Sequence, residues 1–218
     1  MQERLNKLYR SRFNPEEIKK KNRLWKVLCR EFFQKYIPEN ASVLDIGAGY
    51  CEFINNIKAG TKYAVDLNPD TIRFAGSDVK VVICRADQLD FLADGSVDVV
   101  FMSNFLEHLD TKNEVLVILK EAHRALKPGG RILVLLPNIR YVYKKYWDYF
   151  DHKLPLSDKS LAEALEITDF KIIKSYSRFL PYSTKSRLPW NELLIKIYLK
   201  IPLAWYIMGA QAFIVGIK

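Results

Sequence analysis

A short apolar run that ends in a glycine turn constrains this chain more than any other feature. Residues 43–46, VLDI, have the length and composition of a buried parallel strand, and Gly47-Ala48-Gly49 follows directly. Glycine permits the backbone conformations that such a turn needs. We predict that a helix continues over residues 53–58, so that backbone N–H groups of the turn face open space. Such a turn is a site for the polar or anionic end of a nucleotide-like ligand.

Acidic residues near this turn narrow the class of ligand. Asp45 lies within the apolar run, and a buried carboxylate needs a backbone N–H or a cationic ligand group. Residues 62–67 form a second strand-like run, and the strand is predicted to end at Asp66. Asp66 follows Gly47 by 19 residues. This is the spacing at which Rossmann-like folds place a ribose-binding acid. Glu52 stands where a dinucleotide fingerprint has its third glycine, which argues against NAD or FAD and favours a nucleoside without phosphate.

Further strands are predicted along the chain. They occupy residues 79–84, 97–102, 131–136, 170–176 and 212–218, and helices are predicted over 1–36, from 105–109, over 112–126 and over 161–166. Ser157 or Asp158 is the predicted cap of the last of these helices. Four predicted strands end in polar or glycine positions. These positions are Asp45 with Gly47, Asp66, Asp87 and Ser103. Ligands bind outside the carboxyl ends of parallel strands, so these positions are predicted to line one cleft.

Four motifs in this order resemble class I S-adenosylmethionine-dependent methyltransferases: VLDIGAG at 43–49, YAVDLNP at 63–69, RADQLDFLADGSVDVVFMSNFLEHL at 85–109, and LKPGGRILVLLPN at 126–138. The resemblance implies an α/β fold, a Rossmann-like doubly wound seven-stranded mostly parallel sheet with an antiparallel last strand. It implies one domain over 1–218, with an N-terminal helical cap (1–38), a cofactor-binding core (39–138), and a substrate-side insertion, C-terminal helices and closing strand (139–218). The flanks are similar to small methyltransferases of bacterial polysaccharide biosynthesis.

The resemblance also implies the cofactor, S-adenosylmethionine, with S-adenosylhomocysteine as its product and no metal. Asp45, Gly47, Ala48 and Gly49 would hold the methionine end, whose ammonium group suits a carboxylate. Asp66 would bind the ribose hydroxyls, with Leu67 against the adenine. The remaining predicted cofactor residues are Asp87 and Gln88, which would read the adenine, and Ser103 and Asn104. Asp87 has an alternative reading as a turn cap.

The predicted reaction is methyl transfer to a small-molecule or sugar acceptor, at oxygen. His108 and His152 are candidate bases for the acceptor proton. A phenol or carboxylate does not require a base, whereas a sugar hydroxyl, with its high pKa, needs one more. The alternative for His108 is a hydrogen bond that positions the loop. The aromatic and basic segment 139–152 either contacts the acceptor or covers the core.

Charge leaves two other functions open. The net charge of +9 divides into +6 over residues 1–40, −2 over 41–140 and +5 over 141–218. Basic flanks suit an anionic substrate, a membrane surface or nucleic acid, or are solvated helix faces. An RNA methyltransferase and a non-catalytic S-adenosylmethionine-binding protein are the alternatives. Nucleic acid is disfavoured because Ser103-Asn104-Phe105-Leu106 replaces the Asn-Pro-Pro-Tyr type of base-flipping motif.

Composition predicts a cytoplasmic protein. Cys29, Cys51 and Cys84 have no metal-binding spacing, and the start of the chain has no apolar core like that of a signal peptide. Residues 189–209 predict either peripheral membrane contact, a helix folded onto the core, or a homodimer contact. Tyr9, Arg12 and Phe13 either cover the cofactor or merely pack.

Overall fold

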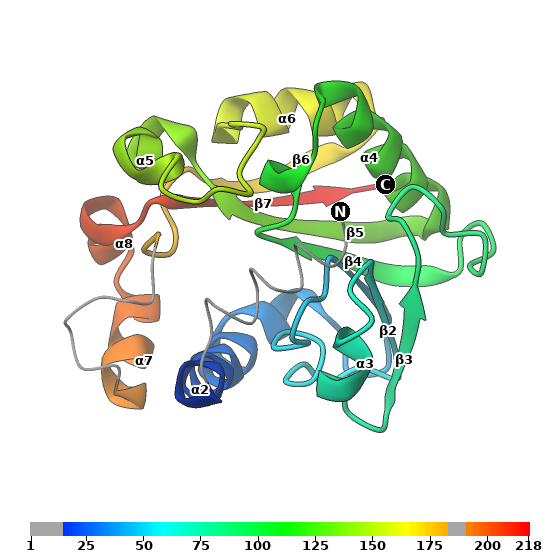
Figure 1. Cartoon of the computed structure of the whole chain (residues 1–218), viewed down its shortest axis with the longest axis horizontal. Coiled ribbons are helices and arrows are strands. Elements are labelled where there is room, and N and C mark those ends of the chain that lie inside the picture. Colours follow the sequence, from blue (N-terminus) through cyan, green and yellow to red (C-terminus); the bar gives the residue numbers. More distant parts are fainter. Residues whose placement is uncertain (1–14, 183–190) are drawn as a thin grey trace.

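A seven-stranded sheet with helices on both faces organises the protein (Figure 1). The computed structural model describes residues 15–182 and 191–218. The strand order is β3-β2-β1-β4-β5-β7-β6. The strands are β1 (Ser42–Ile46), β2 (Thr61–Asp66), β3 (Val79–Ile83), β4 (Val97–Ser103), β5 (Leu126–Pro137), β6 (Lys171–Tyr176) and β7 (Gln211–Ile217). Pairs among β1 to β5 are parallel, and β7 runs antiparallel between β5 and β6, which confirms the predicted fold class.

Side-chain caps begin four of the helices in the described part of the chain. Thr111 caps α4 in a capping box with Glu114, and Ser157 caps α6 as predicted. Asn138 and Asn191 cap α5 and α7 with their side-chain oxygens. The helices are α2 (Pro15–Glu31), η1 (Phe33–Tyr36), α3 (Thr71–Phe74), η2 (Leu106–His108), α4 (Lys112–Ala125), α5 (Ile139–Tyr146), α6 (Asp158–Ile167), α7 (Glu192–Lys200) and α8 (Pro202–Met208).

The two faces of the sheet carry separate cores. Successive residues of a strand point to opposite faces, so Leu44 packs in the core that includes α4 and α6, while Val43 packs in the core that includes α2, α7 and α8. Figure 1 shows α4 and α6 above the sheet and α2 below it. Asp45 follows Val43 by two residues and therefore lies on the α2 face of β1.

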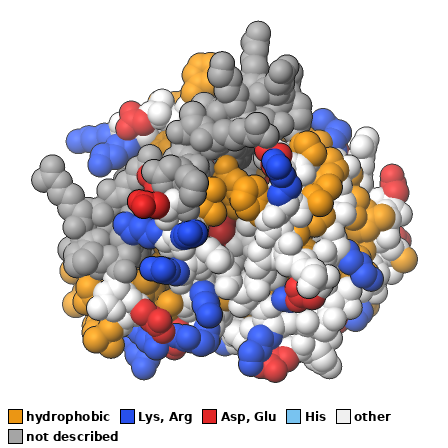
Figure 2. Space-filling view, turned by 60° about the horizontal axis from the view of Figure 1, so that its bottom comes forward, with side chains coloured by type: hydrophobic (Ala, Val, Ile, Leu, Met, Phe, Trp, Pro, Cys, Tyr) orange, Lys and Arg blue, Asp and Glu red, His pale blue; other side chains and the backbone are white. Residues whose placement is uncertain are grey.

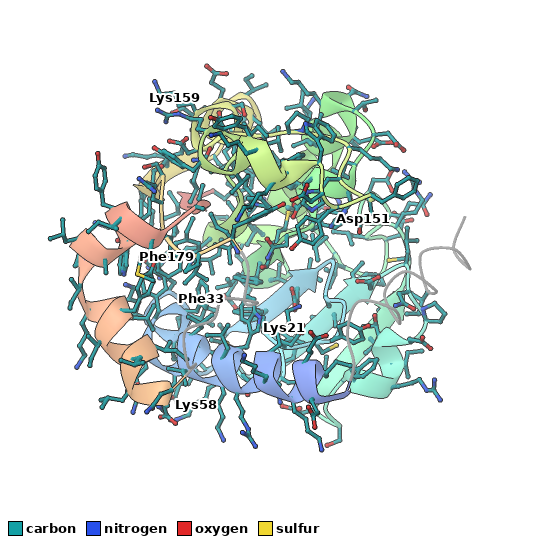
Figure 3. All side chains as sticks on the ribbon, turned by 60° about the vertical axis from the view of Figure 1, so that its left-hand side comes forward. Lys21, Phe33, Lys58, Asp151, Lys159 and Phe179 are labelled. Atoms are coloured by element: carbon teal, nitrogen blue, oxygen red, sulfur yellow. The ribbon has the colours of Figure 1, made fainter. Side chains whose placement is uncertain are left out.

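Aromatic rings fill the α2 face of the sheet. Phe53 stacks on Phe101 with ring centroids 3.6 Å apart, and Phe32 stacks on Phe179 at 4.2 Å. Phe33 and Phe179, both labelled in Figure 3, contact edge to face. Each such pair contributes about 0.5–1.5 kcal/mol beyond its buried area. This cluster holds η1 and the segment after β6 against the sheet.

Three predicted helices differ from the structure. Residues 53–58 form turns instead of a helix. The Asn56 side chain bonds to the carbonyl of Glu52, the acceptor that the Asn56 backbone N–H would use in a helix, and the Asn55 side chain bonds to the carbonyl of Phe74. The predicted helix over 105–109 is only the short η2, and a separate cap at Thr111 starts α4. The N-terminal helix ends at Glu31, before η1.

Helix α7 packs beside α2, and α8 follows α7 almost directly, further along the same side of the molecule (Figure 1). Their outer surfaces expose large apolar side chains, among them Leu193, Leu203 and Ile207. Hydrophobic side chains also gather beside Lys and Arg on the face in Figure 2. None of the helices in the described part of the chain has the length and apolar character needed to span a bilayer. Tyr9, Arg12 and Phe13, predicted as a cover, lie outside the described residues.

Candidate active site

The glycine turn after β1 is fixed by backbone hydrogen bonds. The N–H groups of Gly47 and Ala48 donate to Val65 O at 2.8 and 3.1 Å, and Gly49 N–H donates to Asp66 Oδ2 at 2.8 Å. The prediction that these N–H groups face open space is therefore wrong, because the neighbouring strand end β2 uses them. The turn does not offer these donors to an anion.

Glycine is required at the first position of the turn. Gly47 has φ +72°, and a Cβ there would lie 2.6 Å from Cδ2 of Phe105. Gly49 has φ +52°, but a Cβ there would meet no heavy atom within 4 Å. Both backbone conformations favour glycine, and only Gly47 also needs the missing side chain for close packing.

Carboxylates dominate the surroundings of this turn. Asp45 is 3% exposed, and burial, followed by the nearby Glu52 and Asp66, raises the pKa of its carboxyl well above the usual value. Glu52 forms an ion pair with Lys21 of α2 at 3.0 Å. A cation placed beside Asp45 would relieve the cost of its burial, so this end of the site suits a positively charged ligand group.

Asp66 stands at the end of β2, as predicted, and supports the turn. Its Oδ2 accepts Gly49 N–H and its Oδ1 accepts Asn68 N–H, each at 2.8 Å. Each carboxylate oxygen has further acceptor capacity, so ligand hydroxyls can still bind. Burial raises the pKa of this carboxyl, and the backbone hydrogen bonds oppose that shift.

The predicted cofactor residues fall into two groups. A cavity of about 730 Å³ lies over the carboxyl edge of the sheet. It is lined by six of them: Asp45, Gly47, Ala48, Gly49, Ser103 and Asn104. Asp66, Leu67, Asp87 and Gln88 belong to the same sheet edge but do not line this cavity. Asp87 accepts two hydrogen bonds from the Arg85 guanidinium, at 2.9 and 2.8 Å, which lowers the pKa of its carboxyl.

The other end of the cavity combines η2 with the segment after α5. Both predicted bases, His108 and His152, line it, and their ring centroids lie 5.2 Å apart. His108 Nδ1 lies 3.0 Å from the backbone oxygen of Asp151 and 3.5 Å from its Oδ2. A proton on Nδ1 leaves Nε2 as an acceptor. The bond to Asp151 is of the positioning kind that the alternative reading of His108 predicted.

Glu107 is a residue to which the sequence reasoning gave no role. Its side chain is 2% exposed and lines the cavity, and neither carboxylate oxygen has a hydrogen-bond partner elsewhere among the described residues. Burial raises the pKa of this carboxyl to about 7, an effect that the neighbouring His108 opposes. An acid inside the apolar run FLEHL was the available signal, because a buried carboxylate requires an explanation.

Apolar side chains make up much of the remaining lining of the cavity. Lys21 of α2 and Asp151 approach it from different elements (Figure 3). The apolar wall is made by Trp25, Leu28, Leu180, Ile195, Tyr198 and Ile201, among other residues. Helices α2, α7 and α8 thus cover the cavity on the α2 face of the sheet. This cover includes part of the predicted N-terminal cap and part of segment 189–209.

Sequence comparison identifies a known domain in the centre of the chain. A family described as "Methyltransferase domain" matches residues 44–134. Two curated relatives are both named "Ubiquinone/menaquinone biosynthesis C-methyltransferase UbiE". The protein from Desulfotalea psychrophila is 34% identical over 95 residues, 41% of this chain and 36% of the relative. The protein from Hahella chejuensis is 28% identical over 162 residues, 66% of this chain and 63% of the relative. The chain therefore spans less than two thirds of the length of either relative.

Structure comparison extends the likeness over most of the chain. An S-adenosylmethionine-dependent methyltransferase from Archaeoglobus fulgidus has a TM-score of 0.68 at 24% identity, and the match covers 90% of this chain and 94% of that one. This likeness shows a shared fold. None of these named relatives supports the narrower resemblance to enzymes of polysaccharide biosynthesis. Residues 44–134 thus match a methyltransferase domain, and most of the chain shares the fold of a solved S-adenosylmethionine-dependent methyltransferase.

Proposed function

We propose that this protein transfers a methyl group from S-adenosylmethionine to a small-molecule acceptor held in the cavity over the sheet edge. One observation carries the proposal: a single cavity joins the carboxylate-rich glycine turn to Glu107, His108 and His152. The first end suits a cationic cofactor, and the second offers groups that can take a proton from an acceptor. Methyl transfer requires the cofactor and the acceptor to meet, so both parts must belong to the same cavity.

The chain's residues fit the cofactor. Asp45 would bind the methionine ammonium, because its carboxyl is buried, has a raised pKa and lies beside two further acids. Asp66 would bind the ribose hydroxyls, with Leu67, which is 47% exposed, against the adenine. Asp87 and Gln88 lie beyond them along the same edge. When bound, the cofactor supplies an activated methyl group on its sulfonium, so the protein has mainly to align the acceptor.

The walls of the cavity favour an acceptor with an apolar body and one polar group. Trp25, Leu28 and Ile195 line the space through which such a body would lie. A free sugar, the other predicted acceptor, would bury hydroxyls against these side chains without hydrogen bonds. The predicted site of methylation is oxygen. Carbon is a second candidate, since both curated relatives are named C-methyltransferases and an ionised phenol or enol is nucleophilic at either atom.

Calorimetry tests the cofactor first. Purified protein is titrated with S-adenosylmethionine and, separately, with NAD. We expect binding of S-adenosylmethionine only, strongly weakened by Asp66→Ala. The melting temperature of the variant must be measured beside it, because Asp66 also supports the turn. A preference for NAD, or no binding to the folded protein, would overturn the proposal.

A labelled-methyl screen then tests the acceptor. S-adenosylmethionine with a deuterated methyl group is incubated with the protein and with phenols, quinols, sugars, nucleotide sugars or RNA, and products are analysed by mass spectrometry and NMR. Label on a small apolar acceptor supports the proposal, and NMR assigns oxygen or carbon. Label on RNA, with salt-dependent RNA binding, would establish the RNA alternative instead. Tight cofactor binding without any labelled product favours the non-catalytic alternative.

A further inference from the structure

We propose that Glu107, His108 and His152 bind one divalent transition-metal ion, such as Zn²⁺, at the acceptor end of the cavity. The binding itself is independent of the proposed methyl transfer, whereas the role given to the ion below rests on that function. The proposal goes beyond the cofactor predicted from sequence, which included no metal. It is carried by the ligand set, the environment of Glu107 and the support behind His108.

The three side chains provide a suitable set of ligand atoms. One carboxylate oxygen and one nitrogen from each imidazole all lie within 4.8 Å of one another. Two imidazoles and a carboxylate suit Zn²⁺ and related divalent ions. Ligand atoms around a tetrahedral Zn²⁺ lie about 3.3 Å apart, given bond lengths of about 2.0–2.2 Å. An ion would therefore draw the side chains together by small rotations.

Glu107 provides the second, independent observation. A carboxylate this deeply buried is costly unless a cation or hydrogen-bond donor compensates it. No such partner reaches its oxygens from elsewhere among the described residues, and the side chain lines the cavity. A metal ion between Glu107 and the two imidazoles would supply the missing positive charge.

The residues behind the ligands resemble the outer support of known metal sites. A metal-binding histidine commonly donates its second N–H to a carbonyl or carboxylate, which orients the ring. His108 Nδ1 lies 3.0 Å from the carbonyl oxygen of Asp151 and 3.5 Å from its carboxylate. This arrangement leaves His108 Nε2 to bind the ion.

The backbone holds the two ligand segments together. The carbonyl oxygen of Glu107 accepts hydrogen bonds from the N–H groups of Lys153 and Leu154, at 2.8 and 3.1 Å. The ring of Tyr149 stacks on His152, with centroids 5.0 Å apart. The segment that carries His152 is thus fastened to η2, which limits the loss of conformational freedom on metal binding.

Three protein ligands leave coordination positions open for an acceptor oxygen. An acceptor hydroxyl bound to the ion would lose its proton near neutral pH more readily, because a bound metal lowers the pKa of an oxygen ligand. The O–H bond breaks, the proton leaves to solvent, and the acceptor oxygen keeps the electron pair needed for methyl transfer. The substrate class that fits is a hydroxylated, mainly apolar molecule.

Metal binding is tested on the full chain prepared without a histidine tag. The protein is stripped with a chelator, then dialysed against Zn²⁺ for stoichiometry or titrated with Co²⁺ for its visible spectrum. We expect one ion per chain, with the spectrum of a nitrogen- and oxygen-bound site. Glu107→Gln and His152→Gln should each weaken binding at least tenfold. The matched control is His123→Gln, because this remaining histidine lies in α4, where it packs against Phe170 and does not line the cavity.

Two outcomes would overturn the proposal: no stoichiometric binding by the wild type, or equal binding by wild type, Glu107→Gln and His152→Gln. Circular dichroism of each variant separates lost binding from lost folding. Calorimetry with S-adenosylmethionine on the stripped protein keeps the two proposals distinct. If the cofactor binds and no metal does, only the metal site fails. If the metal binds and the cofactor does not, only the proposed methyl transfer fails.

Discussion

The two ends of the cavity are built in different ways. At the glycine turn two of the three carboxylates are paired, since Asp66 accepts two backbone N–H groups and Glu52 pairs with Lys21, while the buried Asp45 still suits a cation. At the opposite end Glu107 is buried and its carboxylate is compensated by no hydrogen bond from elsewhere in the described residues. The first end is a rigid surface shaped by strand ends. The second has an interaction that a ligand or ion must complete.

Gly47→Ala should break the first end most severely. The positive φ costs roughly 1–2 kcal/mol for a non-glycine residue, and overlap with Phe105 adds about 1–3 kcal/mol. We expect unfolding in urea to show this loss, and calorimetry to show loss of cofactor binding. Gly49→Ala is the matched control, since only the cost of φ applies there. Equal effects of the two substitutions would contradict the role assigned to Phe105.

Glu107→Gln should reduce methyl transfer without weakening cofactor binding. The change removes charge from the acceptor end and leaves the glycine turn intact. We expect cofactor affinity to stay within about twofold, while methyl transfer to an identified acceptor falls about a hundredfold or more, whether Glu107 acts through a proton or through an ion. Calorimetry and a labelled-methyl assay provide the two readouts. A parallel loss of both would show that the ends are one cooperative unit.

Asp45→Asn should weaken the cofactor end by a smaller amount. A hydrogen bond to a charged group is worth about 1.5–3 kcal/mol, which corresponds to roughly tenfold to a hundredfold in affinity. Calorimetry at fixed pH gives this value. An unchanged affinity would show that Asp45 does not bind the ammonium group of the cofactor.

Asp45→Asn should also change how the stability of the protein depends on pH. The folded-state pKa of Asp45 is raised, so at pH values above its unfolded pKa the folded state binds more protons than the unfolded state. Stability from this group therefore falls as pH rises from the unfolded toward the folded pKa. Urea unfolding at several pH values should show that Asp45→Asn is increasingly stabilised relative to the wild type as pH rises. A constant difference would contradict the raised pKa.

Asp87→Asn should have the smallest effect. Its carboxylate is paired with Arg85 and lies outside the cavity, so a contact with the adenine would be exposed to water. We expect a loss in cofactor affinity of less than about tenfold, or 1.4 kcal/mol. A larger loss of affinity would show that Asp87, after β3, contributes as much to cofactor binding as the residues that line the cavity.

The sequence predicted the sheet because its signals are local. Most strands contain an apolar run, and Asp66 and Ser103 each end the strand that was predicted for them. The prediction of a helix over 53–58 was wrong. In this segment the side chains of Asn55 and Asn56 bond to backbone carbonyls. Which backbone N–H groups of the turn remain available depends on β2, and no pattern in residues 43–53 contains that information.

The acceptor end was less predictable because its residues meet only in the folded chain. His108 and His152 were each candidates, but 44 residues separate them, and nothing in their spacing indicates that they are neighbours. The apolar run around Glu107 signals that its carboxylate is buried, but its approach to His152 depends on the fold. The apolar wall from α7 and α8 likewise depends on how these helices pack against α2.

The position of β7 has a consequence for synthesis of the chain. This strand pairs with both β5 and β6, and β7 is the one neighbour that β6 has in the sheet formed by residues 15–182 and 191–218. Segment 171–176 therefore emerges from the ribosome before the strand that will hold it, and waits until 211–217 is made. Pairings between distant segments form slowly and leave strand edges exposed in the meantime. The cofactor half can assemble while translation continues, whereas β6 is the part of the nascent chain that chaperones meet unpaired.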